Sequence, residues 1–419
     1  MARQQMSHRM LHIAMDLPRT PLDRMKFGPV ERLQYEPALA VLRILPLWRR
    51  AAPRSGDLAT MRWLDKLYWL HKARYPVQRP QRNSALEAHF AKHASCELQV
   101  ARGFRARSSA ALSAVGDLSP HAYLRTSEHH LFAEVADVIF DVDLSMANLE
   151  CVVAGSSNQG VEYSPKSGPT FCFDPVTFGV VKGRFQFMAT ACNHSLDMGP
   201  MGVDETIEHL DDAGVLHQGT NLREEDASSA GLVTRNGIRF ALLSWTFGLN
   251  AHAPPPRRPR IVNVCDLNGR VATGNIRLLE EQVRNARTAG ADFVIAHLHW
   301  GMEHEFSPTP SQVAMAHYLA ERGVDAIIGH HPHVVQPLEL YQTRRDPNRV
   351  VPIYYSLGNL VNPFSAPWLT TGWVARMEVA LGTDEGGNSR AYVTAANTVE
   401  VQQHSDARTQ TLTLRRTSH

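Results

Sequence analysis

The sequence lacks several features that define common classes of protein. Its five cysteines are scattered, odd in number and without a C-x-x-C pair, which argues against a disulfide framework and against a zinc ribbon. Lys and Arg total 43 against 41 Asp and Glu, a balance that argues against a strong non-specific nucleic-acid binder. The sequence contains no G-x-x-x-x-G-K nucleotide loop, so ATP-driven ligation is not supported. No G-x-S-x-G surrounds Ser195, which argues against a serine hydrolase.

Long apolar runs are also missing. No stretch reaches the roughly 18 consecutive apolar residues that a membrane-spanning helix needs. The N-terminal residues are partly basic but have no apolar core of signal-peptide length. We therefore expect a cytoplasmic chain without stable membrane insertion. Export by another route and homo-oligomerisation stay open.

The texture of the chain changes near residue 106. Residues 1–105 are rich in arginine, and the pattern over 60–76 predicts an amphipathic helix that packs on a neighbouring domain. Beyond this extension apolar strands alternate with helical patterns, among them 129–142, and a hairpin is predicted at Asn236-Gly237. The alternation predicts a layered α/β domain with mixed sheets over 106–405, an N-terminal, mostly helical extension over 1–105, and a C-terminal tail over 406–419.

Polar side chains follow directly on five apolar strands. They are Asp117, Glu150, the pair Asn193 and His194, His299, and the histidines of "GHHPH" at 329–333. Ligand sites in α/β folds form at the carboxyl ends of strands, so these side chains are expected to meet at one place. Carboxylate, imidazole and amide groups suit Mn²⁺, Fe²⁺ or Zn²⁺. The sequence therefore predicts a site for one or two divalent metal ions, with Mn²⁺ favoured.

Six blocks in order carry a family resemblance. They are "VGD", "ANLE", "ACNHSLDMG", "HLHWGMEHE", "IIGHHPHVVQPLELY" and "IYYSLGN". Between about residues 108 and 380 the chain resembles the poly-γ-glutamate capsule biosynthesis (CapA-like) family, itself similar to calcineurin-like metallophosphoesterases. The resemblance implies a metallophosphoesterase-like fold and does not extend to the first hundred residues.

The resemblance also implies roles for individual residues. Asp117 would bind one ion, Glu150 would bridge two, and Asn193 and His299 would bind the second. His331 and His333 would reach both ions, His194 would protonate a leaving group, and Asp197 would orient His194 or its loop. Two positions differ from the phosphoesterase pattern: Ser119 stands where a histidine is usual, and Glu150 where an aspartate is.

Other residues have more than one interpretation. Glu303 is a candidate for substrate contact or simply solvated, and Ser356 and Asn359 either shape a substrate pocket or form a tight turn. For His330 an outward-facing or ligand-supporting role is at least as well favoured as direct metal ligation. His297 is expected to be buried or to support a ligand, because His299 lies nearer the strand end.

The resemblance implies a metal-dependent hydrolase in which metal-bound hydroxide attacks a phosphoester or a γ-glutamyl amide. Its substrate would be an anionic small molecule or polymer of poly-γ-glutamate or capsule metabolism. The alternative is a non-catalytic, metal-binding accessory protein of polymer synthesis.

Overall fold

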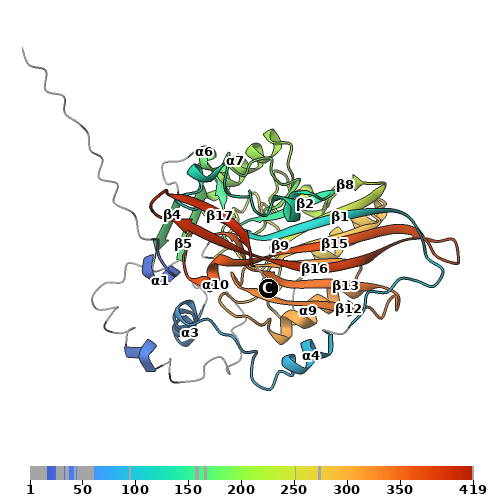
Figure 1. Cartoon of the computed structure of the whole chain (residues 1–419), viewed down its shortest axis with the longest axis horizontal. Helices are drawn as coiled ribbons and strands as arrows, with labels where there is room; N and C mark the ends of the chain where they lie inside the picture. The colour runs from blue at the N-terminus through green and yellow to red at the C-terminus, as the bar shows by residue number, and fades with distance from the viewer. Residues whose placement is uncertain are drawn as a thin grey trace, which may run out of the picture.

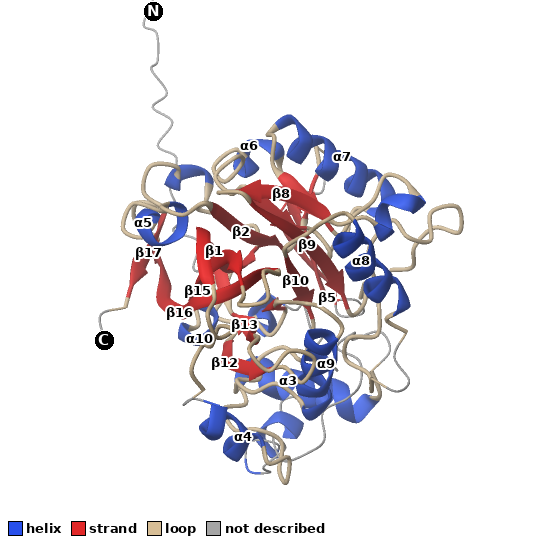
Figure 2. Ribbon diagram, turned by 90° about the vertical axis from the view of Figure 1, so that its right-hand side faces the viewer, coloured by secondary structure: helices blue, strands red, loops and turns tan. Residues whose placement is uncertain are grey.

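The computed structural model describes residues 17–24, 33, 37–41, 44, 61–93, 96–155, 160–164, 168–250, 252–271 and 275–417. The fold is built on two large sheets that face each other, with helices outside them (Figures 1 and 2). The layered α/β fold with mixed sheets that the sequence predicts is confirmed.

The larger sheet has the strand order β17-β16-β15-β1-β2-β6-β7, with β14 also paired to β1. β1, β2, β6 and β7 are parallel, whereas β15, β16 and β17 are antiparallel additions. The strands span Arg105–Leu118 (β1), Leu144–Leu149 (β2), Phe187–Ala189 (β6), Leu216–Gln218 (β7), Asn359–Val361 (β14), Thr371–Thr383 (β15), Ser389–Asp406 (β16) and Thr411–Arg416 (β17).

The second sheet has the order β12-β13-β11-β10-β9-β8, and β9, β10, β11 and β13 are parallel. The predicted hairpin is confirmed: β8 and β9 are joined at Asn236 and Gly237, whose φ angles of 49° and 77° suit a tight hairpin turn. The strands span Gly231–Arg235 (β8), Ile238–Thr246 (β9), Phe293–His299 (β10), Ala326–His330 (β11), Val335–Gln342 (β12) and Val350–Leu357 (β13). A small third sheet contains Val152–Val153 (β3), Gly160–Ser164 (β4) and Gly168–Phe173 (β5).

The main core lies between the two large sheets. Alternate residues of β1 and β2, such as Leu112 and Met146, pack in one cluster with Phe240 of β9 and Ile295 of β10. Successive strand residues point to opposite faces, so the same strands also supply the outer cores. On the outer face of the second sheet, α8 and α9 pack over β10 and β11. This sandwich fixes where each parallel strand ends.

The helices lie outside the sheets (Figure 2). They span Pro21–Arg24 (α1), Trp63–Arg74 (α3), Leu86–His93 (α4), Ala136–Phe140 (α5), Pro175–Phe178 (α6), Gly199–Asp212 (α7), Arg277–Thr288 (α8), Pro310–Glu321 (α9) and Pro367–Thr370 (α10), with 3₁₀ turns at Arg125–Ser127 and Glu224–Ser228. No helix within the described ranges is long and apolar enough to cross a bilayer.

Two expectations for local structure are corrected. The predicted helix over 129–142 is mostly turns, with only α5 helical, because the carbonyl of Leu131 accepts a bond from the Leu414 amide (2.9 Å) rather than from the helix's next turn. The predicted tail after 405 contains β17, whose Leu412 and Leu414 alternate into the core. The C-terminal residues therefore extend the larger sheet.

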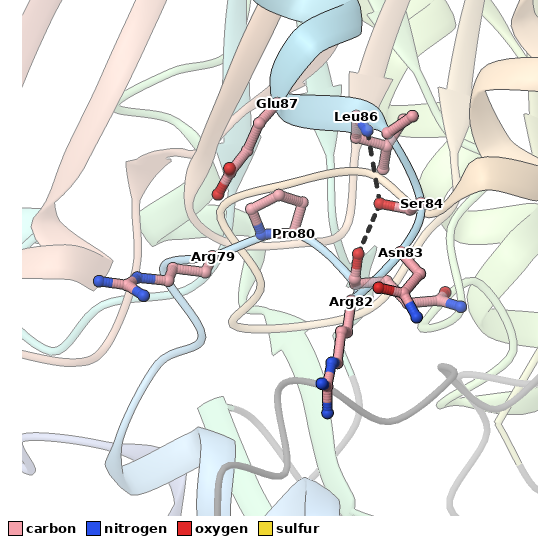
Figure 3. A pocket seen from close by; sticks show the side chains of 9 residues that line it. Arg79, Pro80, Arg82, Asn83, Ser84, Leu86 and Glu87 are labelled. Carbon is pink, nitrogen blue, oxygen red and sulfur yellow. Dashed lines mark hydrogen bonds between the residues drawn. The ribbon is translucent and has the colours of Figure 1, made fainter.

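The predicted helix over 60–76 is α3, and its packing against the domain is confirmed. Leu67 and Leu70 are buried, but the neighbouring Trp63 and Leu64 are exposed. After α3 the chain forms a turn with a shallow pocket along residues 79–87 (Figure 3). There the Ser84 hydroxyl donates to the Gln81 carbonyl (2.5 Å) just before α4 begins. The pocket is lined by this loop and by the first two residues of α4.

Asp325 anchors the start of β11 through a buried cluster of charges. Its carboxylate is almost fully buried and contacts Arg287, Arg345 (3.2 Å) and Arg349 (2.8 Å), while the Val294 amide donates to it (2.9 Å). Burial alone would raise the pKa of Asp325, but the three guanidinium groups hold this pKa below its usual value.

We expect Asp325→Asn to lower the free energy of unfolding by about 3 kcal/mol or more, because it leaves partly buried arginines without a counter-charge. Since the folded pKa lies below the unfolded one, this contribution is present above the unfolded pKa and is lost as pH falls through the folded pKa. Urea denaturation at neutral pH measures it. The control Asp211→Asn, whose side chain is 65% exposed, should cost less than about 1 kcal/mol. Equal losses would contradict the prediction.

Candidate metal centre

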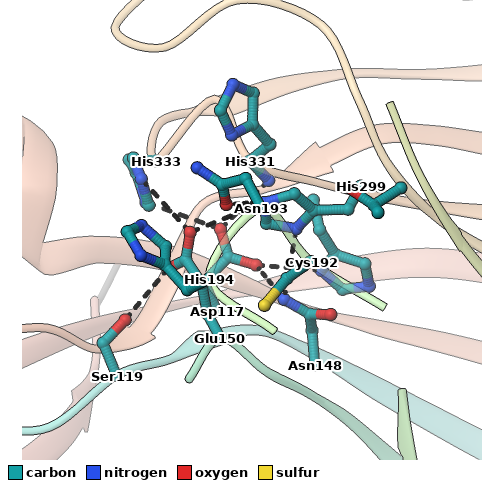
Figure 4. A network of polar contacts seen from close by, with 12 residues as sticks. Asp117, Ser119, Asn148, Glu150, Cys192, Asn193, His194, His299, His331 and His333 are labelled. Atoms are coloured by element: carbon teal, nitrogen blue, oxygen red, sulfur yellow. Dashed lines mark hydrogen bonds and ion pairs between the residues drawn. The ribbon is translucent and has the colours of Figure 1, made fainter. Parts of the chain in front are cut away.

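The carboxyl ends of strands from both large sheets meet at one rim. Asp117 is the penultimate residue of β1, Glu150 follows β2, and His299 ends β10. His331 and His333 come directly after β11. The structure therefore brings together five of the six predicted ligands within one buried network, and the sixth, Asn193, joins it from the loop after β6 (Figure 4).

One group consists of Asp117, Glu150 and His333, whose ligand atoms all lie within 4.8 Å of one another. Glu150 Oε1 is 3.4 Å from His333 Nε2, and Asp117 Oδ2 is 3.5 Å from His333 Nδ1. Ligand atoms bound at about 2.1 Å from one ion lie roughly 3.0–3.5 Å apart. The separation between Glu150 Oε1 and His333 Nε2 suits a shared cation, whereas the Asp117 distance is to the other ring nitrogen of His333.

The second group consists of Glu150, His299 and His331. Glu150 Oε1 is 3.6 Å from His299 Nε2, and the rings of His299 and His331 are 4.9 Å apart. The carboxamide oxygen of Asn193 contacts His299 Nε2 (2.8 Å). Because Glu150 belongs to both groups, its carboxylate lies where a bridging ligand is expected.

Unsatisfied polar atoms show that this donor set fits a cation. Among the described residues, Glu150 Oε1 and both ring nitrogens of His331 are buried without a hydrogen-bond partner. Such atoms are unfavourable inside a protein unless something binds them. Cys192 lies beside the network (Figure 4), but burial raises the pKa of its thiol well above the usual value, so it stays protonated and is a poor ligand.

The electrostatics point the same way. Burial, followed by the charge of Asp117, raises the pKa of Glu150 well above its usual value. Burial and the neighbouring imidazoles lower the pKa of His299 and of His331 well below theirs. Neutral imidazoles keep their lone pairs available, and a divalent ion would favour the ionised form of Glu150. The neutral imidazoles therefore supply no positive charge to balance the carboxylates of the centre.

Two hydrogen bonds hold the carboxylates in place. Asn148 Nδ2 donates to Asp117 Oδ1 (2.8 Å), and the Ser119 hydroxyl donates to Glu150 Oε2 (3.0 Å). His330 is buried rather than facing outward, and its Nδ1 is 3.2 Å from Asp117 Oδ1 without forming a hydrogen bond. Its ring stacks on His297, which is buried as expected. Sequence reasoning missed Asn148, although it stands in the same "ANLE" block as Glu150.

The loop after β11 has an unusual backbone. His331 and His333 have φ angles of 94° and 58°, in a region that residues with a side chain seldom adopt. The His331 amide donates to Asp117 Oδ2 (3.1 Å), which ties the loop to the other sheet. Strain of this kind is found where a loop must aim its side chains at a site.

His194 lies at the edge of the centre with one nitrogen occupied. Its Nδ1 is 2.7 Å from Asp197 Oδ2, and its ring stacks on Phe171 with centroids 4.3 Å apart. Burial alone would raise the pKa of Asp197, but His194 holds it below the usual value. An ionised Asp197 favours the proton on Nδ1, so His194 Nε2 is the nitrogen left to exchange a proton with a substrate.

The N-terminal extension reaches the centre through α3. Glu303 Oε1 is 3.9 Å from His333 Nε2, and the Trp69 indole donates to Glu303 Oε2. Lys72 is almost fully buried, and its Nζ is 2.7 Å from Glu305 Oε1. The sequence alone gave no functional role to this helix. Nothing in the sequence around Trp69 or Lys72 indicates their contacts with Glu303 and Glu305.

The predicted substrate residues of "IYYSLGN" have other contacts. Ser356 is fully buried, and its hydroxyl accepts a bond from the Gly358 amide (3.2 Å). Asn359 Oδ1 contacts His333 Nδ1 (3.0 Å), and its Nδ2 donates to the His333 and Leu369 carbonyls. These contacts favour the tight-turn interpretation. Asn359 also orients the His333 ring through its contact with Nδ1.

The chain matches the family described as "Bacterial capsule synthesis protein PGA_cap" over residues 111–363. It is 26% identical over 249 residues to "Capsule biosynthesis protein CapA" of Bacillus anthracis (59% of this chain, 56% of that protein). It is 29% identical over 197 residues to "PGA biosynthesis protein CapA" of Bacillus subtilis (45% of each). A "Probable polyglutamine synthesis accessory protein" of Mycobacterium tuberculosis is 25% identical over 228 residues (53% and 56%). The chain thus spans about half the length of these relatives.

Among solved structures, the chain is similar to the calcineurin-like phosphoesterase YfkN from Bacillus subtilis. The TM-score is 0.38 at 13% sequence identity, covering 70% of this chain and 90% of that one.

Metal analysis of the purified full chain tests the centre. His331→Ala should lose at least one equivalent of bound divalent metal after dialysis, measured by inductively coupled plasma mass spectrometry. Asn148→Ala removes the hydrogen bond that positions Asp117 but no ligand, so it should weaken metal affinity about 10–100-fold. The control His404→Ala alters an exposed histidine of β16 and should bind as the parent does. Unchanged metal content in His331→Ala would contradict the assignment.

Removal of the buried charge of Lys72 tests the docking of α3. Lys72→Met leaves Glu305 buried without its cation, so the free energy of unfolding should fall by about 3–5 kcal/mol in urea denaturation. Lys66→Met, on the same helix, is the matched control, and it should change stability by less than about 1 kcal/mol. Similar effects of both variants would show that the ion pair contributes little.

Proposed function

The chain belongs to the bacterial capsule synthesis protein family, and from this membership and its candidate metal centre we propose that it is a metal-dependent hydrolase. The observation that carries the proposal is a shared buried carboxylate, Glu150, between two ligand groups, with the His194–Asp197 pair at their edge. A set of metal ligands without a proton donor would suit a protein that only binds metal. An imidazole held by a carboxylate beside those ligands is what proton transfer requires.

Asp117, Glu150 and His333 would hold one ion, and Glu150, His299 and His331 a second, with Asn193 beside His299. Bound divalent ions would supply an acidified water molecule and positive charge for an anionic transition state. The donors are oxygen and nitrogen atoms, which suits Mn²⁺, Fe²⁺ or Zn²⁺. Asn148 and Ser119 keep the two carboxylates aimed at the site.

His194 would donate a proton from Nε2 to the departing oxygen or nitrogen. Its Nδ1 contact with Asp197 keeps the ring in one tautomer, and the stacked Phe171 ring limits its rotation. Asp197 also accepts a bond from the Phe171 amide (2.6 Å), so the carboxylate, the ring and the β5 backbone are fixed together. Asp197 is thus a positioning residue for His194.

The substrate we propose is an anionic compound with a phosphoester or a γ-glutamyl amide bond. The names of the relatives refer to capsule and polyglutamate synthesis, which favours the γ-glutamyl bond of a polymer. A phosphoester is the second candidate, because the same donor set and proton donor serve both reactions. Family membership alone does not decide between them.

A different function deserves equal experimental weight, because one relative is named an accessory protein of polymer synthesis. In that case the ions would hold polymer carboxylates, and no bond would be broken. The two functions differ in whether His194 matters: it would be essential for turnover and of little consequence for binding.

Turnover by the purified full chain with Mn²⁺ decides between them, with an aryl phosphate and a γ-glutamyl oligomer as substrates. His194→Ala should lower kcat about 10²–10⁴-fold while bound metal is unchanged. Asp197→Asn should lower kcat less, because the ring remains present but is less well oriented. His404→Ala serves as the control. Polymer binding without cleavage of either substrate would favour the accessory function and overturn the hydrolase.

A further inference from the structure

A second cluster of metal-type ligands lies outside the centre described above. It joins His89 of α4, His317 of α9 and Glu339 of β12, and their ligand atoms all lie within 4.8 Å of one another. Both histidines present Nε2 to the same carboxylate oxygen: Glu339 Oε1 is 3.0 Å from His89 and 2.8 Å from His317. None of the three belongs to either group around Glu150.

The surroundings hold these side chains in position. The Tyr355 hydroxyl donates to Glu339 Oε2 (2.7 Å), which leaves Oε1 directed at the two imidazoles. The Tyr341 ring stacks on His317 with centroids 4.0 Å apart and planes 12° apart. Ligands fixed by outer hydrogen bonds and stacked rings are typical of built metal sites.

The separations come close to those of a tetrahedral ion. Imidazole nitrogen and carboxylate oxygen bind Zn²⁺ at about 2.0–2.2 Å, which puts neighbouring ligand atoms about 3.3 Å apart. The observed 2.8 and 3.0 Å would open by a few tenths of an ångström. The two imidazole side chains are 24% and 25% exposed, so solvent reaches both rings.

Glu339 lies at the middle of the cluster. Its side chain is fully buried and contacts both imidazoles and the Tyr355 hydroxyl. One carboxylate and two imidazoles from three different elements form a donor set of the kind that Zn²⁺ takes in proteins.

We propose that His89, His317 and Glu339 bind a divalent transition metal, with Zn²⁺ the best fit, as a structural site that fastens α4 to the sandwich. His317 and Glu339 lie inside the matched family region of 111–363, whereas His89 lies outside it. The site therefore exists only when the N-terminal extension is docked. The proposal does not depend on the proposed hydrolase activity.

Zinc titration of the full chain tests it, in a His331→Ala background that reduces binding at the first centre. The background protein is stripped with chelator and compared with versions that also carry His317→Ala or Glu339→Gln. Glu339→Gln keeps the shape and one of the two acceptor oxygens but removes the charge, so folding should survive even if His317→Ala disturbs packing. Background protein carrying His404→Ala is the matched control.

The background protein and the His404→Ala control should bind one more equivalent of Zn²⁺ than either test variant. In Co²⁺-loaded protein, the visible absorption of a tetrahedral ion should disappear in the variants. Zinc should also protect the 79–93 segment from proteolysis in the background protein alone. Equal zinc stoichiometry in the background protein and in folded Glu339→Gln would overturn the proposal and leave three side chains joined by hydrogen bonds only.

Discussion

The structure depends on burying groups that repel one another unless a cation lies between them. Asp117 and Glu150 lie at the ends of strands of one sheet, His299 and the histidines of 331–333 lie at the ends of strands of the other, and all converge in a buried seam. Imidazole nitrogens and carboxylate oxygens approach to 3.4–3.6 Å, and Glu150 Oε1 and both ring nitrogens of His331 have no hydrogen-bond partner. Such a cluster is unfavourable by itself, so its presence is strong physical evidence for ion binding.

Much of this could be predicted from the sequence because the signals are local. A polar residue directly after an apolar strand identifies Asp117, Glu150 and His299 without any knowledge of tertiary contacts. The layered fold follows from the alternation of strands and helices. The turns at 129–135 were mistaken for helix because an apolar pattern does not reveal that β17 takes up the Leu131 carbonyl.

The contributions of the first hundred residues could not be predicted, since each depends on a partner more than two hundred residues away. Trp69 meets Glu303, Lys72 meets Glu305, and His89 meets Glu339. In the sequence, each of these residues looks like an ordinary part of an amphipathic helix. The family match begins at residue 111, so these contacts are an addition to the shared domain.

The hydrogen bond from the His331 amide to the Asp117 carboxylate has a mechanical consequence. It crosses the seam between the sheets at the same point as the ligand groups, so relative sliding of the two layers would break a hydrogen bond and disperse the donors in one motion. The contacts that keep the two sheets in register would therefore also keep the ligand groups together. A partner that separated the two sheets would also separate the ligand groups.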